Sequence, residues 1–137
     1  MAIPSIWKIV LIDDEEDIRE VMAVALQDAG YTVETAADGA TGIELCAAIY
    51  PQIVITDIRM PGIDGLQVLD TIKEKFPDIE VIVATAFGEM DLAIRALQLD
   101  ASDFVTKPIS DEALNLALKR AKNRFNSRKQ LKDYTTI

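Results

Sequence analysis

Side chains able to carry phosphate chemistry follow four of five short apolar runs in the chain. Asp13 and Asp14 come after the first run, Asp57 after the third, Thr85 after the fourth and Lys107 after the fifth. Three carboxylates brought together repel one another as ions, and oxygen ligands without His or Cys favour a hard cation such as Mg²⁺. With the metal, the ammonium and the hydroxyl stabilising an incoming phosphoryl group, one carboxylate could act as the nucleophile.

Each of these residues also has an ordinary structural explanation. An Asp after a strand often caps the next helix, Thr85 fits an interior strand position, and Lys107 fits a solvated loop. Their joint placement after successive strands of one sheet is not required by those explanations. The set therefore favours a functional site, which we expect at one edge of the sheet.

The elements that must position these residues follow from hydrophobic spacing. Five runs rich in Val and Ile are each too short for a helix and predict strands, while the stretches between and after them have helical spacing. Ser110 is placed to cap the fifth helix. The predicted strands are Lys8 to Ile12, Thr32 to Ala36, Ile53 to Thr56, Val81 to Ala84 and Phe104 to Thr106.

Alternation of strands and helices predicts an α/β fold, a three-layer α/β/α sandwich with a five-stranded parallel sheet and five helices. Right-handed crossovers leave few arrangements, and the flavodoxin-like strand order 2-1-3-4-5 is the commonest at this length. The site is then expected at the carboxyl ends of strands 1 and 3.

Composition excludes several classes of function. The chain has 137 residues, enough for one core, and a net charge of −9, which disfavours general nucleic-acid binding. It contains no His, so it offers neither His acid/base catalysis nor a phospho-histidine of its own. Its one cysteine, Cys46, is interpreted as a small core residue. No signal peptide or membrane span is recognisable, and a cytoplasmic location without membrane contact is expected.

Charge is distributed unevenly along the chain. Residues 1–110 hold 7 basic against 20 acidic residues, whereas residues 111–137 hold 7 against 3. The apolar stripe of the last helix loses its register after Phe125, where Arg128 and Lys132 occupy the next expected places. We divide the chain into a domain over residues 1–124 and a helical extension over 125–137 that leads to a further domain. The basic end is interpreted as a linker, the start of a coiled coil or a solvated face.

From about Lys8 to Arg124 the chain resembles the receiver domain of two-component response regulators, in the CheY-like superfamily. Four stretches carry the resemblance: Ile-Val-Leu-Ile-Asp-Asp-Glu at 9–15, Ile-Val-Ile-Thr-Asp-Ile-Arg-Met-Pro-Gly-Ile-Asp-Gly at 53–65, Ala-Thr-Ala at 84–86 and Asp-Phe-Val-Thr-Lys-Pro at 103–108.

The resemblance implies a role for each site residue. Asp57 is the phosphoacceptor. Asp57 and Asp14 bind Mg²⁺ directly with the backbone carbonyl of Arg59, and Asp13 binds through water. Thr85 hydrogen-bonds the phosphoryl group and Lys107 pairs with it.

The resemblance also implies how a signal passes. Phe104 is the aromatic switch that follows Thr85, and the Lys107-Pro108 bond is cis. The phosphoryl donor is a histidine kinase or phosphotransfer protein, and phosphorylation changes partner affinity through the face of helix 4, strand 5 and helix 5. A homodimer through that face or through the C-terminal helix is compatible with the resemblance. Such a chain is not an enzyme, although it assists its own phosphorylation and dephosphorylation.

Three departures from the family pattern stand out. Asp100 occupies a position before Ala101 where the family has Gly, so a left-handed helix end there is costlier. Arg59 and Phe87 occupy variable positions that control water access, and together they predict slow hydrolysis of the acyl phosphate.

Two other readings compete with a working receiver. A magnesium-dependent phosphohydrolase of the haloacid dehalogenase type would share the Asp nucleophile, but needs a second Asp where Arg59 stands. An interaction module that lost phosphorylation would lack Asp, Thr or Lys from the site, and none is missing. The parent protein is expected to be a hybrid sensor histidine kinase, a transcription activator or a stand-alone regulator.

Overall fold

The computed structural model describes residues 6–136, with side chains described as far as residue 132. Ten elements alternate along the chain. The strands are β1 (Lys8–Ile12), β2 (Thr32–Ala36), β3 (Ile53–Asp57), β4 (Glu80–Thr85) and β5 (Asp103–Thr106). The helices are α1 (Glu16–Asp28), α2 (Gly39–Ile49), α3 (Gly65–Lys75), α4 (Met90–Gln98) and α5 (Asp111–Thr136).

The five strands form one parallel sheet in the order β2-β1-β3-β4-β5, which confirms the predicted topology. Ile12 of β1 lies beside Thr56 of β3, and Asp57 lies beside Ala84 of β4. The carboxyl ends of these neighbouring strands therefore share one edge of the sheet. The order of the strands reverses between β1 and β3, because β2 lies on one side of β1 and β3 to β5 lie on the other.

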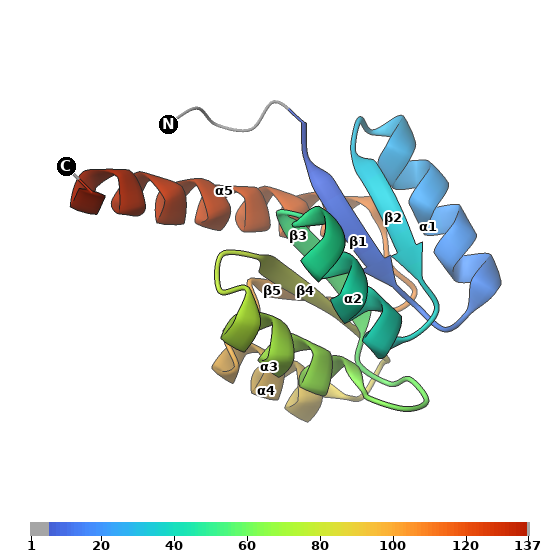
Figure 1. Ribbon diagram of the computed structural model, residues 1–137. Coiled ribbons are helices and arrows are strands. Elements are labelled where there is room, and N and C mark those ends of the chain that lie inside the picture. The colour runs from blue at the N-terminus through green and yellow to red at the C-terminus, as the bar shows by residue number, and fades with distance from the viewer. Residues whose placement is uncertain (1–5, 137) are drawn as a thin grey trace.

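Helices cover both faces of the sheet (Figure 1). Alternate residues of the central strands point to opposite sides, as Val54 and Ile55 do, so each face contributes to its own core. One core lies under α2, α3 and α4 and contains Cys46, and the other lies under α1 and α5. Burial raises the pKa of the Cys46 thiol to about 12, which agrees with its interpretation as a core residue.

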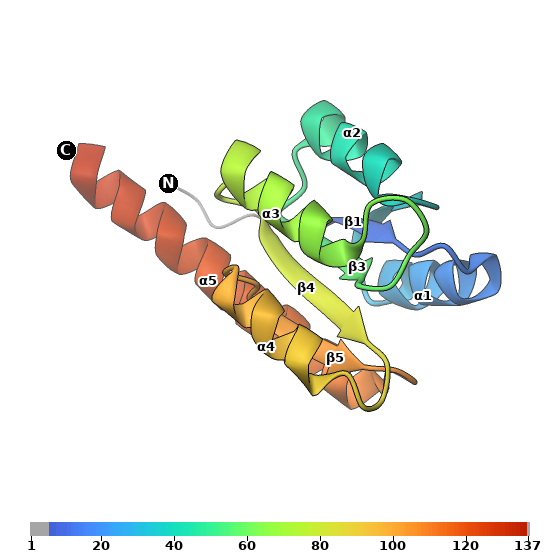
Figure 2. The ribbon, with the colours of Figure 1, turned by 90° about the horizontal axis from the view of Figure 1, so that it is seen from below.

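Local capping explains where several helices begin. The side chains of Asp38 and Asp64 accept hydrogen bonds from backbone N–H groups in the first turns of α2 and α3. Ser110 accepts one from the N–H of Ala113, which confirms the predicted cap of α5. That helix continues without a break across residue 124 and extends beyond the edge of the sheet (Figure 2). No helix in the described part of the chain is both long and apolar enough to cross a membrane.

Candidate functional site

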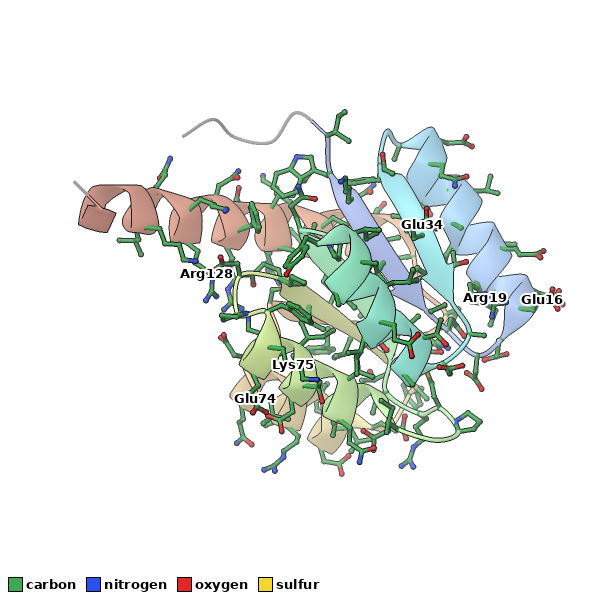
Figure 3. The ribbon with its side chains drawn as sticks, viewed as in Figure 1. Glu16, Arg19, Glu34, Glu74, Lys75 and Arg128 are labelled. Carbon is green, nitrogen blue, oxygen red and sulfur yellow. The ribbon has the colours of Figure 1, made fainter. Side chains whose placement is uncertain are left out.

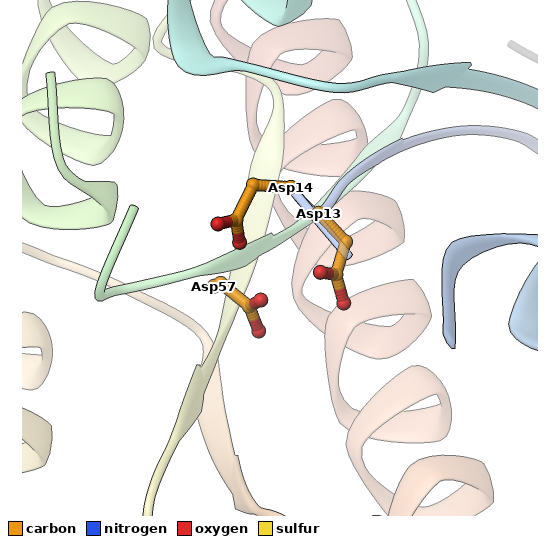
Figure 4. A group of neighbouring side chains, drawn as sticks. All are labelled: Asp13, Asp14 and Asp57. Carbon is orange, nitrogen blue, oxygen red and sulfur yellow. The ribbon is translucent and has the colours of Figure 1, made fainter. Parts of the chain in front are cut away.

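Three carboxylates meet at the carboxyl edge of the sheet. Asp13 and Asp14 follow β1, and Asp57 is the last residue of β3. One oxygen from each lies within 4.8 Å of the others, and the three side chains face a common space (Figure 4). Asp13 and Asp57 are only 2% and 5% exposed, while Asp14 is exposed. The structure thus brings together the three acidic residues that the sequence predicts.

Lys107 places its ammonium group among these acids. Its Nζ lies 2.7 Å from Oδ2 of Asp57 and 3.7 Å from carboxylate oxygens of Asp13 and Glu15. The backbone N–H of Lys107 donates to the carbonyl of Thr85, which ties the end of β5 to β4. The Lys107-Pro108 peptide bond is cis, as the resemblance implies. Burial alone would lower the pKa of the ammonium, but the hydrogen bond and the charges of its acidic neighbours raise it.

The carboxyl group of Asp57 has a strongly perturbed pKa. Burial raises its pKa to about 7, because the charged form loses its water. The hydrogen bond from Lys107 opposes this rise, and the charge of Asp13 adds to it. A single ammonium thus compensates several nearby carboxylates incompletely, which is the electrostatic condition that a bound divalent cation relieves.

The residues assigned to switching lie on the neighbouring strands. Thr85 ends β4 and is 3% exposed, one position beyond the residue that pairs with Asp57. Phe104 lies in β5 and packs partly buried against the core beneath α4. Both positions agree with the predicted path from the site to the face formed by α4, β5 and α5.

An ion pair that the sequence reading missed crosses the mouth of the site. Arg59, from the loop after β3, pairs through its Nε with Glu89, which precedes α4. Glu89 also accepts a hydrogen bond of 3.1 Å from the N–H of Ala86. Both residues line a hollow of about 210 Å³ above Asp57. Phe87 is 91% exposed and does not line this hollow, whereas Arg59 and Glu89 do.

The donor set fits a hard divalent cation. It consists of carboxylate oxygens from Asp13, Asp14 and Asp57, two of them buried, and it contains neither sulfur nor imidazole. Such oxygen ligands suit Mg²⁺, which keeps several waters when few protein ligands bind it. Arg59, whose carbonyl the resemblance names as a ligand, lines the same hollow as Asp57.

The sheet carries three acids and a lysine at the edge where its strand order reverses. This arrangement is typical of flavodoxin-like α/β proteins, which bind ligands at that edge. Comparison with known families is more specific. The model of the response regulator receiver domain matches residues 9–119, and the chain belongs to this family. The phosphohydrolase alternative is therefore left without support.

Curated relatives and solved structures agree with this assignment. The chain is 40% identical over 121 residues to the DNA-binding transcriptional regulator NtrC of Escherichia coli, covering 88% of this chain and 26% of the relative. It is 37% identical over 123 residues to the C4-dicarboxylate transport transcriptional regulatory protein DctD of Rhizobium meliloti, covering 90% and 26%. The chain thus spans about a quarter of the length of these relatives.

Two solved structures have folds similar to that of this chain. NtrX from Brucella abortus in complex with ADP superposes with a TM-score of 0.89 at 31% identity, covering 94% of this chain and 30% of that one. A response regulator receiver domain protein from Clostridium thermocellum superposes with a TM-score of 0.83 at 32% identity, covering 92% and 99%. The second comparison is with a chain almost entirely matched by the present fold.

Proposed function

We propose that the chain accepts a phosphoryl group on Asp57 with Mg²⁺ bound beside it. The observation that carries this proposal is the position of the Asp57 carboxylate, 2.7 Å from the ammonium of Lys107 and within 4.8 Å of oxygens from Asp13 and Asp14. A nucleophilic carboxylate between a cation site and a fixed ammonium is suited to phosphoryl transfer.

Each site residue has a separate role in the phosphoryl transfer. Asp13, Asp14, Asp57 and the carbonyl of Arg59 would hold Mg²⁺, which supplies neutralisation of phosphoryl charge. An oxygen of Asp57 attacks phosphorus as the bond from phosphorus to the donor's imidazole nitrogen breaks, and the imidazole leaves on the donor. Lys107 pairs with the transferred oxygens and leaves its hydrogen bond to free Asp57. Thr85 donates its hydroxyl to the same group.

These 137 residues contain no His, so a phospho-histidine donor would lie outside them. A largely apolar hollow of about 360 Å³ lies next to Lys107 and supports docking of a histidine kinase or phosphotransfer protein there. It is lined by Ile18, Val21 and Met22 of α1 and by Pro108 and Ile109 after β5, together with Asp17 and Lys107. A partner seated on this surface would have its histidine at the open side of the site.

Switching would pass from Thr85 to Phe104 and on to the surface of α4, β5 and α5. Phe104 is only partly buried, and the exposed side of α4 presents Met90, Ile94 and Leu97. Phosphorylation would shift the population toward the arrangement in which this face, or the C-terminal helix, binds a partner or a second copy.

The parent protein is proposed to be a longer transcription activator. Its relatives NtrC and DctD are regulators about four times the length matched here. A hybrid sensor histidine kinase remains the competing proposal. Reading the gene beyond the codon for Ile137 distinguishes them, because an ATPase and DNA-binding region would support the first and a kinase region the second.

Incubation with acetyl phosphate and Mg²⁺, followed by intact mass measurement, tests the function directly. The wild type should gain one phosphoryl group, whereas Asp57→Asn should gain none and Asp70→Asn, an exposed α3 control, should behave as wild type. Lys107→Ala should still bind metal but lose most of the structural response, since the ammonium acts on phosphoryl oxygens. Equal labelling of Asp57→Asn and wild type would show that another residue is the acceptor.

A further inference from the structure

Glu80 begins β4 at the end of the sheet opposite the phosphoacceptor, and its side chain is fully buried. Each carboxylate oxygen faces a different arginine of α5. Oε1 lies 3.4 Å from Nε of Arg124, and Oε2 lies 3.2 Å from a terminal guanidinium nitrogen of Arg128. Burying a carboxylate is costly unless cations compensate it, and an apolar residue would serve the core of β4 more simply.

The two arginines lie one helical turn apart, on the side of α5 that faces the rest of the molecule. Figure 3 shows Arg128 pointing in this direction. Arg124 also donates to the carbonyl of Ala101 at 3.1 Å and to Oδ1 of Asp100 at 2.7 Å. One cation therefore contacts both the start of β4 and the turn between α4 and β5.

Asp100 connects this cluster to α4. It lies just after the helix with φ of 76°, a left-handed conformation that a residue other than Gly adopts at some cost. Its carboxylate is 3.8 Å from Arg128 and 3.7 Å from Lys73 of α3, in addition to its hydrogen bond from Arg124. These three cations compensate the Asp that stands where the family has Gly.

The side of α5 that faces the domain changes from apolar to charged residues, while the spacing of these residues along the helix stays the same. Leu114, Leu118, Ala121 and Phe125 fill its buried positions in the first four turns. The next two positions in the same three-and-four spacing are Arg128 and Lys132, and they meet acids, Glu80 for the first and Asp78 for the second. The apolar stripe of α5 therefore ends at Phe125 because the helix contacts the domain through ion pairs beyond that residue.

We propose that residues 124–132 form an arm that Glu80 anchors to the receiver, so that α5 leaves the domain in one fixed direction. The arm lies beyond the stretch that the family model matches, which ends at residue 119. In this proposal the basic end of α5 is bound to the domain, and it is neither a solvated face nor a linker without contacts. Because Asp100 ends α4 and shares both arginines, a displacement of α4 would be felt directly by the arm. The inference does not depend on phosphorylation of Asp57.

Hydrogen exchange on the 137-residue chain tests the anchor. Backbone amides of residues 125–132 should be protected in the wild type, and Glu80→Gln should accelerate their exchange by at least about tenfold. Arg128→Gln, which removes the shorter of the two ion pairs of Glu80, should act in the same direction. Lys119→Gln removes a charge from the exposed side of the same helix and should leave the arm unchanged.

Amides of β1 and β3 separate release of the arm from unfolding of the whole domain, because they exchange only when the sheet opens. The double variant Glu80→Gln with Arg128→Gln should accelerate exchange less than the product of the single effects, since both changes disrupt one contact. The proposal is overturned if the wild-type arm exchanges as fast as an unstructured peptide, or if both single variants leave its exchange within about twofold of wild type.

Discussion

Asp57 is held at a position where its charge is poorly compensated. Its carboxyl pKa is raised from 3.8 to about 7 by burial and by Asp13, despite the hydrogen bond from Lys107. The folded state therefore binds more protons at this site than the unfolded state between those pH values. Asp57 contributes stability below its unfolded pKa and loses that contribution as pH rises through about 7. A functional carboxylate thus weakens the metal-free fold at neutral pH.

Asp57→Asn should stabilise the metal-free protein. Asn keeps the shape of the side chain and removes the charge, so we expect a gain of about 2 kcal/mol in unfolding free energy at pH 8. The gain should shrink as the pH falls toward 5, because wild-type Asp57 then becomes neutral. Urea denaturation with a chelator present measures the difference. Asp70→Asn, on the exposed side of α3, should change little, and a destabilised Asp57→Asn protein would contradict the electrostatic account.

Arg59 is expected to slow the loss of phosphate. Paired with Glu89 at the mouth of the hollow, its side chain hinders the approach of water to the acyl phosphate. Arg59→Asn should raise the rate of hydrolysis about fivefold, equivalent to roughly 1 kcal/mol of barrier. Intact mass followed over time gives the rate.

Two further variants test whether the change in hydrolysis rate is due to Arg59 itself or to the residues near it. Glu89→Gln should show a smaller increase in hydrolysis, because Arg59 loses the charge that positions it. Phe87→Glu should leave the rate near that of wild type, since Phe87 is 91% exposed. Equal rates in Arg59→Asn and wild type would remove the shielding role.

Sequence reasoning grouped the residues that follow strands but missed Glu89. Asp13, Asp14, Asp57 and Lys107 could be grouped because parallel strands end at a common edge. Glu89 could not, because its partner Arg59 is 30 residues away and the pairing depends on the shapes of two loops. The sequence also gives no direction to the side chain of Phe87, which is 91% exposed in its loop.

At the scale of elements, the loop after β3 is restricted by Gly65, the first residue of α3. A Cβ added there would lie 2.0 Å from the carbonyl oxygen of Asp57 and 2.7 Å from Cα of Ile58. Backbone atoms cannot retreat without moving Asp57. Gly65→Ala should therefore cost about 2–3 kcal/mol of unfolding free energy and lower phosphorylation by acetyl phosphate.

Gly39→Ala is the matched control for this substitution. Gly39 is likewise the first helical residue after an Asp cap, but its added Cβ would meet side-chain atoms of Val68 and Ile63. Those side chains can shift, so the loss of stability should be smaller and phosphorylation should be retained. Chemical denaturation and labelling of both variants decide the point. Equal effects at the two glycines would show that the close approach to Asp57 has no special consequence.

The limits of β1 and β2 were predicted to the residue, whereas those of the other strands were one residue short at one or both ends. In β4 the reason is physical, since Glu80 is charged and yet fully buried, and an apolar criterion excludes it. Asp57 and Asp103 were left out of β3 and β5 on the same grounds. The continuation of α5 past residue 124 was predicted. Its docking depends on ion pairs between distant residues, which no local pattern reveals.

Over the whole molecule, acidic residues at the two ends of the sheet have different surroundings. At the amino end, Glu80 and Asp100 are compensated by arginines from the basic end of α5. At the carboxyl end, Asp13 and Asp57 both pair with Lys107, and the carboxylate of Asp14 lies beside them. The uneven charge of the sequence therefore becomes a neutralised edge that anchors a helix and an acidic edge that attracts a cation.

The acidic edge should make global stability depend on Mg²⁺ and pH together. A ligand that binds only the folded state stabilises it by about 2.7 kcal/mol at one hundred times its dissociation constant. We expect Mg²⁺ to raise the unfolding midpoint at pH 8 and to do so less at pH 6, because a proton on Asp57 competes with the metal below about pH 7.

Thermal unfolding with Mg²⁺, compared with NaCl of equal ionic strength, separates binding from screening. Asp57→Asn should lose most of the Mg²⁺ response. An equal response to Mg²⁺ and NaCl would mean that the carboxylates are screened without holding an ion.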